Sequence, residues 1–205
     1  MDNAYESTNP RERSDIGMVL QVVVYVYNPL SMSAISGLMQ MPIERVQAAL
    51  APLHSLIYIP SSQHPAKHIS IFHASFYDFI SNQNISSEHH LDPYVSHKSL
   101  ALQCLSLMDK EWSGKTNVPY LVERRCEDIS ESLAYACSSW VLHFTYAESN
   151  HESAELKHFF QTHLLRWMDC LSILGKLGPA MNLLHILESW ANTNVSNLAV
   201  EDGWH

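Results

Sequence analysis

Apolar residues recur every three or four positions through most of the chain beyond residue 92, and this spacing restricts the fold more than any other feature. An α-helix turns once in 3.6 residues, so side chains at this spacing form a stripe along one face that must be buried. Four such stripes occupy residues 101–112, 129–144, 164–174 and 183–190. They predict an α-helical bundle domain over residues 91–193, followed by a tail over residues 194–205.

The first half of the chain mixes helix and strand patterns. The apolar run at 16–27 fits a strand by its β-branched residues and a buried helix by its length, and its periodicity does not separate the two. Ser31 is placed to cap a short helix over residues 32–39, and Pro42 suits the first turn of another helix.

Two β-rich runs, residues 56–59 and 68–72, flank a polar loop and predict a hairpin. A further helical pattern follows at 74–81, and the polar stretch 82–90 ends the module. Helices and a two-stranded wing in this order describe a winged helix over residues 16–90. The expected fold is therefore mainly α: a winged helix (three helices plus a two-stranded β wing) followed by the α-helical bundle.

The composition is typical of a folded protein from a reducing compartment. Of 205 residues, 46% are hydrophobic and 16% are charged, which is too apolar for a disordered chain. The four cysteines are far apart and form no CxxC pair, so we expect reduced core thiols. Residues 1–15 are polar and predict a disordered tail instead of a signal peptide, and no later run is long enough to span a bilayer. We expect a cytoplasmic protein with no membrane contact.

The net charge opposes binding to nucleic acid. The formal charge is −9 and the pI is near 5.7, which repels phosphate-rich partners unless a basic patch overrides it. In the alternative function, a DNA-binding winged helix, a recognition helix would present Lys and Arg to the groove. The corresponding segment, residues 42–53, offers only Arg45, next to Glu44. We therefore expect no nucleic-acid partner.

No sequence motif supports an enzyme. Gly114, Lys115 and Thr116 look like the end of a P-loop, but Asp109 stands where that motif needs its first glycine, and a helical pattern leads into it. There is no GxSxG elbow, and the thirteen histidines show no HExxH or zinc-type spacing. We expect surface or core histidines, no catalytic residue, no metal and no cofactor bound by this chain.

Five strings stand in the order and at the spacing of a known family. They are NPLSMSAISGLM (28–39), ALAPLHSLIYIP (49–60), IFHASFYDFI (71–80), SLAYACSSW (132–140) and HLLRWMDCLSILGKL (163–177). In these strings the chain resembles the segment after the NACHT NTPase domain of fungal NOD-like STAND proteins, where a winged helix, a helical region and often WD repeats follow. The resemblance covers residues 16–190. The segment 113–128 is shorter than the corresponding segment of the family.

The resemblance implies a non-enzymatic regulatory module for protein interaction in signal transduction. Such a module relays the nucleotide state of the NACHT domain to downstream repeats. Because the chain contains neither the NTPase core nor WD repeats, we expect a fragment or truncated relative. Its partner would be a NACHT domain or another protein, and ADP or ATP would be bound by the missing NACHT domain.

His73 is the site residue that the resemblance singles out. It stands where a winged-helix histidine of the related NTPases reaches the β-phosphate of bound ADP, which implies an ADP-phosphate sensor that works only with a NACHT domain present. An imidazole N–H can donate to a phosphate oxygen and so couple nucleotide state to domain position. The family's His-Asp pair is here His73-Ala74, so the role of the aspartate is absent or moved. A structural histidine that packs the wing is the second interpretation.

Overall fold

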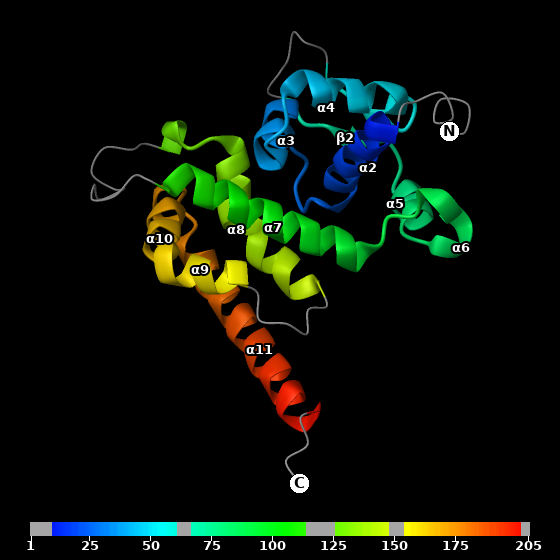
Figure 1. Cartoon of the computed structure of the whole chain (residues 1–205). Helices are drawn as coiled ribbons and strands as arrows, with labels where there is room; N and C mark the ends of the chain where they lie inside the picture. The colour runs from blue at the N-terminus through cyan, green and yellow to red at the C-terminus, as the bar shows by residue number, and fades with distance from the viewer. Residues whose placement is uncertain (1–9, 61–66, 114–125, 148–153, 202–205) are drawn as a thin grey trace. The chain divides into compact units, whose positions relative to one another are not determined.

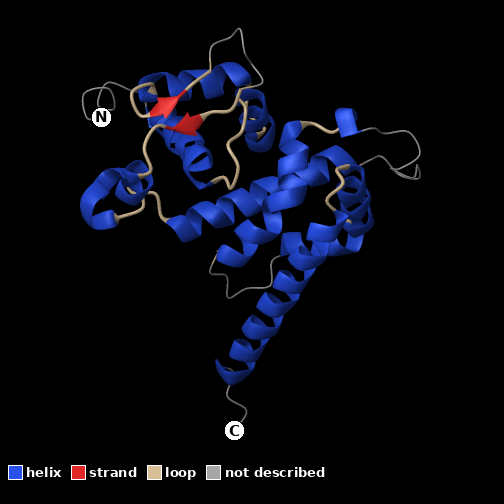
Figure 2. Ribbon diagram, turned by 180° about the vertical axis from the view of Figure 1, so that it is seen from behind, coloured by secondary structure: helices blue, strands red, loops and turns tan. Residues whose placement is uncertain are grey.

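The structure, a computed structural model, describes residues 10–60, 67–113, 126–147 and 154–201 (Figure 1). These residues are mainly helical, with one antiparallel pair of short strands (Figure 2), so the predicted mainly α class is confirmed. The chain divides into two compact units, unit 1 (Met1–Ser96) and unit 2 (His97–His205). This division lies inside a helix, a few residues beyond the domain boundary predicted at residues 90 and 91.

Three α-helices begin unit 1, and the last of them packs against the other two. They are α2 (Pro10–Tyr25), α3 (Met32–Met39) and α4 (Ile43–Leu50), which the 3₁₀ turn η1 (Ala51–Leu53) extends. The apolar run that fitted either a helix or a strand is helical up to Tyr25. Its residues are buried on most sides, with Val19 and Val22 fully enclosed, and an all-round apolar helix suits a core position.

The residues at the starts of α3 and α2 suit those positions. Ser31 Oγ accepts the backbone N–H of Ala34 at 3.1 Å, which confirms the predicted cap of α3. The disordered tail predicted for residues 1–15 is corrected for residues 10–15, because α2 begins at Pro10, a residue that suits a first helical turn. Residues 1–9 lie outside the described part of the chain.

The predicted hairpin strands are present as β1 (Ile57–Tyr58) and β2 (Ser70–Ile71). They are antiparallel, with Ile57 opposite Ile71, and Ile57 is buried. The loop tip at residues 61–66 lies outside the described residues. A further hydrogen bond, from the N–H of Ile69 to the carbonyl of Leu30 at 2.8 Å, ties the second strand segment to the turn before α3.

Three short helical segments complete unit 1. They are α5 (Ser75–Ile80), α6 (Gln83–Ser86) and the 3₁₀ turn η2 (Ser87–His89). The polar stretch predicted to end the module therefore folds, and Asn82 caps α6 by accepting the N–H of Asn84 at 3.1 Å. Phe76 and Ile80 anchor α5 by their buried side chains.

Unit 2 is helical in its described elements. After α7 (Pro93–Trp112), which begins in unit 1, come η3 (Cys126–Asp128), α8 (Glu131–Tyr146), α9 (Ala154–Thr162), α10 (Leu164–Ile173) and α11 (Leu177–Glu201). The four predicted stripes fall in α7, α8, α10 and α11, whereas α9 was not predicted. Because α11 continues to Glu201, the tail predicted from residue 194 begins too early. None of the helices described combines the length and apolar character needed to cross a membrane.

Aromatic rings form the centre of unit 2. The ring centroid of Trp140 in α8 lies 4.8 Å from that of Phe159 in α9 and 5.8 Å from that of Trp167 in α10, and all three side chains are buried. Trp167 Nε1 donates to the carbonyl oxygen of Cys137 at 2.8 Å, which attaches α10 to α8. This packing fixes α9 and the start of α10, where two histidines lie.

Candidate functional sites

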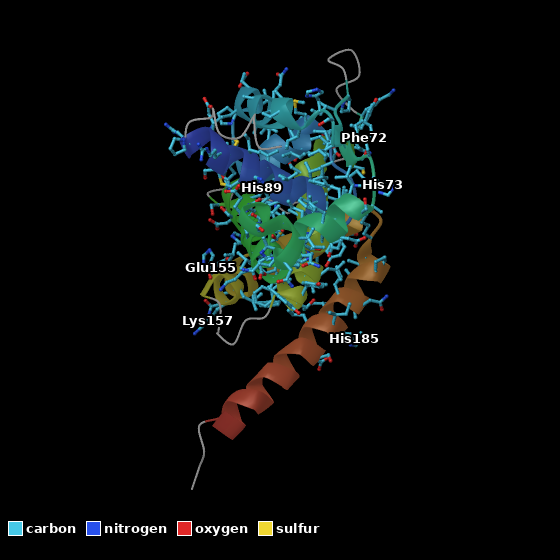
Figure 3. All side chains as sticks on the ribbon, turned by 90° about the vertical axis from the view of Figure 1, so that its right-hand side faces the viewer. Phe72, His73, His89, Glu155, Lys157 and His185 are labelled. Carbon is cyan, nitrogen blue, oxygen red and sulfur yellow. The ribbon has the colours of Figure 1, made fainter. Side chains whose placement is uncertain are left out.

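His73 lies in the short connection between β2 and α5, with an exposed side chain (Figure 3). Its Nδ1 accepts the backbone N–H of Ser75 at 3.1 Å and lies 2.7 Å from Ser75 Oγ. A backbone N–H can only donate, so Nδ1 is the acceptor in this arrangement, and Nε2 is the ring nitrogen that bears the proton. The exposure argues against a histidine that packs the wing, while the bonds to Ser75 give the ring a local role at the start of α5.

Phe72 is the aromatic neighbour of His73 and is 61% exposed. Its backbone N–H donates to the carbonyl oxygen of Leu56 at 3.1 Å, so the main chain at this point is attached to the segment before β1. Figure 3 shows Phe72 and His73 labelled next to each other on this connection. Two consecutive residues with exposed side chains, one aromatic and one imidazole, therefore follow β2.

Arg45, the one basic residue of α4, forms a bidentate ion pair with Asp15 of α2. Its Nε and Nη2 donate to the two carboxylate oxygens of Asp15, each at 2.6 Å. The Asp15 side chain is 9% exposed, and the hydrogen bond to it raises the pKa of Arg45 above its usual value. The guanidinium that would contact a DNA phosphate is therefore engaged within unit 1.

A second cluster, which we call the Asp109 cluster, joins Asp109 of α7, His158 of α9 and His163 at the start of α10. Asp109 Oδ1 lies 2.8 Å from His163 Nε2 and 3.3 Å from His158 Nε2. One atom from each residue, of the kinds that bind metal ions, lies within 4.8 Å of the others. Two imidazoles and one carboxylate, from α7, α9 and the α9–α10 junction, therefore lie close together.

His163 is the fixed member of the cluster. It occupies the junction between α9 and α10, where its N–H donates to the carbonyl of Phe159 at 2.8 Å and its carbonyl accepts the N–H of Trp167 at 2.9 Å. Its side chain is 7% exposed and its ring centroid lies 5.6 Å from that of Trp112. His163 Nδ1 is buried and has no hydrogen-bond partner among the described residues.

Asp109 is ionised more readily than an ordinary aspartate. The hydrogen bond from His163 is the largest cause that lowers the pKa of Asp109, and the hydrogen bonds from Ser113 and His158 lower it further. Ser113 Oγ donates to the same Oδ1 atom at 2.9 Å. The cluster thus holds a negative charge between two imidazole rings.

An open pocket of about 340 Å³ adjoins the Asp109 cluster. Apolar and polar side chains of α7 and α9 line it together with the three cluster residues; they include Leu102, Leu105, Ser106, Glu155 and Phe159. The cluster therefore borders a cavity large enough for water or a small ligand.

A third group, His97 of α7 with His143 and Tyr135 of α8, is buried in unit 2. The Nδ1 atoms of His97 and His143 are 2.7 Å apart, and Tyr135 Oη lies 2.6 Å from His143 Nε2. Burial lowers the pKa of His97 to about 4, and burial together with the charge of His97 lowers the pKa of His143 to about 3. Both rings are neutral near pH 7, and this group holds α7 to α8.

The cysteines of unit 2 are free thiols. Cys104, Cys137 and Cys170 are buried, as expected, and the Sγ atoms of Cys137 and Cys170 are 3.5 Å apart. Cys126 differs from the expectation of core thiols, because it is exposed in η3. Burial raises the pKa of the Cys104 thiol, so it is a poor nucleophile near neutral pH.

Of these groups, the sequence predicted His73 and the buried thiols. His73 lies where the pattern placed it, whereas Gly114, Lys115 and Thr116 lie outside the described residues. The Asp109 cluster was not predicted, because in one continuous helix residues five positions apart point about 140° away from each other. The break between α9 and α10 instead turns His158 and His163 toward one carboxylate.

Comparisons with known proteins return no relative for this chain. No protein-family model matches it, and neither does any curated protein or solved structure.

Proposed function

We propose that the chain is a non-enzymatic regulatory module that docks onto a NACHT-type NTPase domain, and that unit 1 is its winged-helix part. The order α2, α3, α4, β1, β2 supports this assignment, because three helices precede a two-stranded wing. In this proposal the helices of unit 2 form the bundle that passes the nucleotide state on to downstream repeats. The choice of a NACHT domain as the partner rests on the resemblance over residues 16–190.

One observation carries the docking proposal: His73 is exposed, and its bond to Ser75 leaves Nε2 as the proton-bearing atom. An imidazole N–H donor suits a phosphate oxygen of ADP held by a docked domain. A hydrogen bond to a charged acceptor contributes about 1.5–3 kcal/mol. Phe72, the preceding residue, is exposed and offers apolar area for the partner to bury.

DNA binding, the alternative function for a winged helix, has weaker support. α4 contains a single basic residue, Arg45, and two of its three guanidinium nitrogens, Nε and Nη2, donate to Asp15 at 2.6 Å. To contact a phosphate through Nε or Nη2, Arg45 would have to leave a carboxylate that is almost fully buried. The net charge of −9 adds a general repulsion from DNA.

The proposal is tested by measuring binding of the full chain to the NACHT domain of a fungal STAND protein, once loaded with ADP and once free of nucleotide. We expect tighter binding to the ADP-loaded domain. His73→Ala should weaken that binding about ten- to hundredfold, the equivalent of one charge-assisted hydrogen bond, and leave binding to the nucleotide-free domain unchanged.

Two variants sharpen this experiment. His73→Gln keeps an N–H donor near the position of Nε2 and should retain part of the preference for ADP. His185→Ala removes an exposed histidine of α11, whose side chain is 72% exposed, and should change nothing. Equal binding to both nucleotide states, or a preference for ADP that survives His73→Ala, would show that His73 senses no phosphate.

A further inference from the structure

We propose that the Asp109 cluster binds a divalent transition-metal ion of the zinc type, through His158 Nε2, His163 Nε2 and Asp109 Oδ1. This inference is independent of the NACHT proposal, because it rests only on side chains of unit 2. Imidazole nitrogen and carboxylate oxygen are common zinc ligands, and three protein ligands with a fourth position left open form a familiar class of zinc site.

The distances between the three atoms are close to those that such an ion requires. Zinc lies about 2.0–2.2 Å from nitrogen and oxygen ligands, so neighbouring ligand atoms of a tetrahedral site are about 3.3 Å apart. Asp109 Oδ1 lies 3.3 Å from His158 Nε2 and 2.8 Å from His163 Nε2. All three atoms lie within 4.8 Å of one another, so closing them around an ion takes shifts of about 1.5 Å or less.

The three side chains differ in burial, so that His163 would be a fixed ligand and His158 an adjustable one. His163 is 7% exposed and held at the α9–α10 junction, whereas the side chains of His158 and Asp109 are 57% and 47% exposed. The His158 ring can therefore move onto an ion without disturbing the core. An ion would replace the hydrogen bonds that both rings now make to Asp109.

The pocket beside the cluster supplies the remaining coordination positions. Its volume of about 340 Å³ leaves room for water or for a ligand group at an open site of the ion. Glu155 lines the same pocket and precedes His158 by three residues, so both lie on one face of α9. Figure 3 shows Glu155 on this helix.

The affinity of the Asp109 cluster for zinc should be moderate. Metal-binding histidines usually donate their second N–H to a carboxylate or carbonyl, and losing that support costs about 10- to 100-fold in affinity. His163 Nδ1 has no such partner among the residues described. We therefore expect affinity below that of structural zinc sites, in the micromolar range.

The test is titration of the full chain at pH 7.5 with Zn²⁺ in competition with a chromogenic chelator, and separately with Co²⁺. We expect one ion per chain and, for Co²⁺, visible absorption bands of the intensity typical of four-coordinate ions. Zn²⁺ should also raise the midpoint of thermal unfolding, because an ion that binds only the folded chain stabilises it.

Variants of the two exposed ligands keep the test clear of folding defects. His158→Ala and Asp109→Asn should each lower the affinity at least tenfold and abolish the thermal shift and the Co²⁺ bands. His185→Ala is the matched control, because His185 lies 3.6 Å from Glu188 in a similar but solvent-exposed pair. Absence of binding, or binding that both ligand variants retain, would overturn the proposal and assign the cluster to hydrogen bonding alone.

Discussion

His97 and His143 meet through their Nδ1 atoms, 2.7 Å apart, in the interior of unit 2. One of these atoms must donate and the other accept, so the two rings cannot both be charged without placing two N–H groups against each other. Tyr135 Oη, 2.6 Å from His143 Nε2, continues the chain of hydrogen bonds. Burial lowers the pKa of both rings, so the neutral pair is the form present near pH 7.

This pair predicts that acid begins to destabilise the protein below about pH 6.5, before most carboxylates are protonated. The pKa values are about 4 for His97 and about 3 for His143 when folded, against about 6.5 when unfolded, so the unfolded chain binds more protons between these values. The stabilisation is complete above pH 6.5 and is lost as the pH falls toward 4. Each histidine contributes at most about 1.4 kcal/mol per pH unit, measurable by urea unfolding at a series of pH values.

His97→Leu checks the origin of this slope. It removes one titrating ring, so the free energy of unfolding should fall less steeply between pH 6.5 and 4, whatever its value at pH 7.5. His185→Gln, on the surface of α11, should leave the slope unchanged. A slope that His97→Leu does not alter would place the acid sensitivity elsewhere.

Trp140 is expected to contribute strongly to the stability of unit 2. Trp140→Ala should lower the free energy of unfolding by about 3–5 kcal/mol, because the ring is fully buried against Phe159 and Trp167. Trp140→Phe keeps an aromatic ring and removes the buried Nε1, which has no partner among the described residues, so it should cost much less. Similar losses for the two variants in chemical denaturation would contradict this ranking.

The cysteines should differ sharply in reactivity. In the folded chain a chromogenic disulfide reagent should modify Cys126 quickly, and Cys104, Cys137 and Cys170 only after unfolding, since these three are buried. Cys126→Ser should remove the fast phase and leave the slow one. Fast reaction of a second thiol in native protein would mean that the core opens readily.

DNA should not bind specifically. With Arg45 paired to Asp15 and a net charge of −9, we expect no duplex shift in gel electrophoresis at physiological salt with competitor DNA present. Asp15→Asn removes the anion that holds Arg45 and serves as the comparison. A shift given by the original chain and lost in Arg45→Gln would favour the DNA-binding alternative.

The isolated chain should not turn over ATP, because its sequence contains no complete phosphate-binding loop. Phosphate release from ATP with Mg²⁺ should equal that of buffer alone, for both the original chain and Lys115→Ala. Turnover that Lys115→Ala abolishes would reverse this expectation.

Features set by neighbouring residues were predictable from the sequence. Ser31 begins α3 because its side chain and the amide it caps are three residues apart, and the β-rich runs around Ile57 and Ile71 pair as expected. His73 could be placed between strand and helix for the same reason. Its tautomer depends on Ser75, two residues away, and was not considered from the sequence.

Features set by distant residues were not predictable. Asp15 was assigned to a disordered tail because its partner, Arg45, is 30 positions away. Asp109 is 49 and 54 residues from the two histidines that surround it. Helix α9 was missed from the sequence, although Phe159 is buried in the core. Only tertiary packing supplies these contacts.

A shortened version of unit 1 must include Asp15, because this residue forms the ion pair with Arg45. A version beginning at Ile16, where the apolar run starts, would lack the carboxylate and the first turns of α2. Arg45 would then lack the Asp15 carboxylate, and its guanidinium would be available to bind adventitious phosphate. Binding measurements on such a version would show a basic surface at Arg45 that the longer chain does not have, because there Asp15 neutralises it.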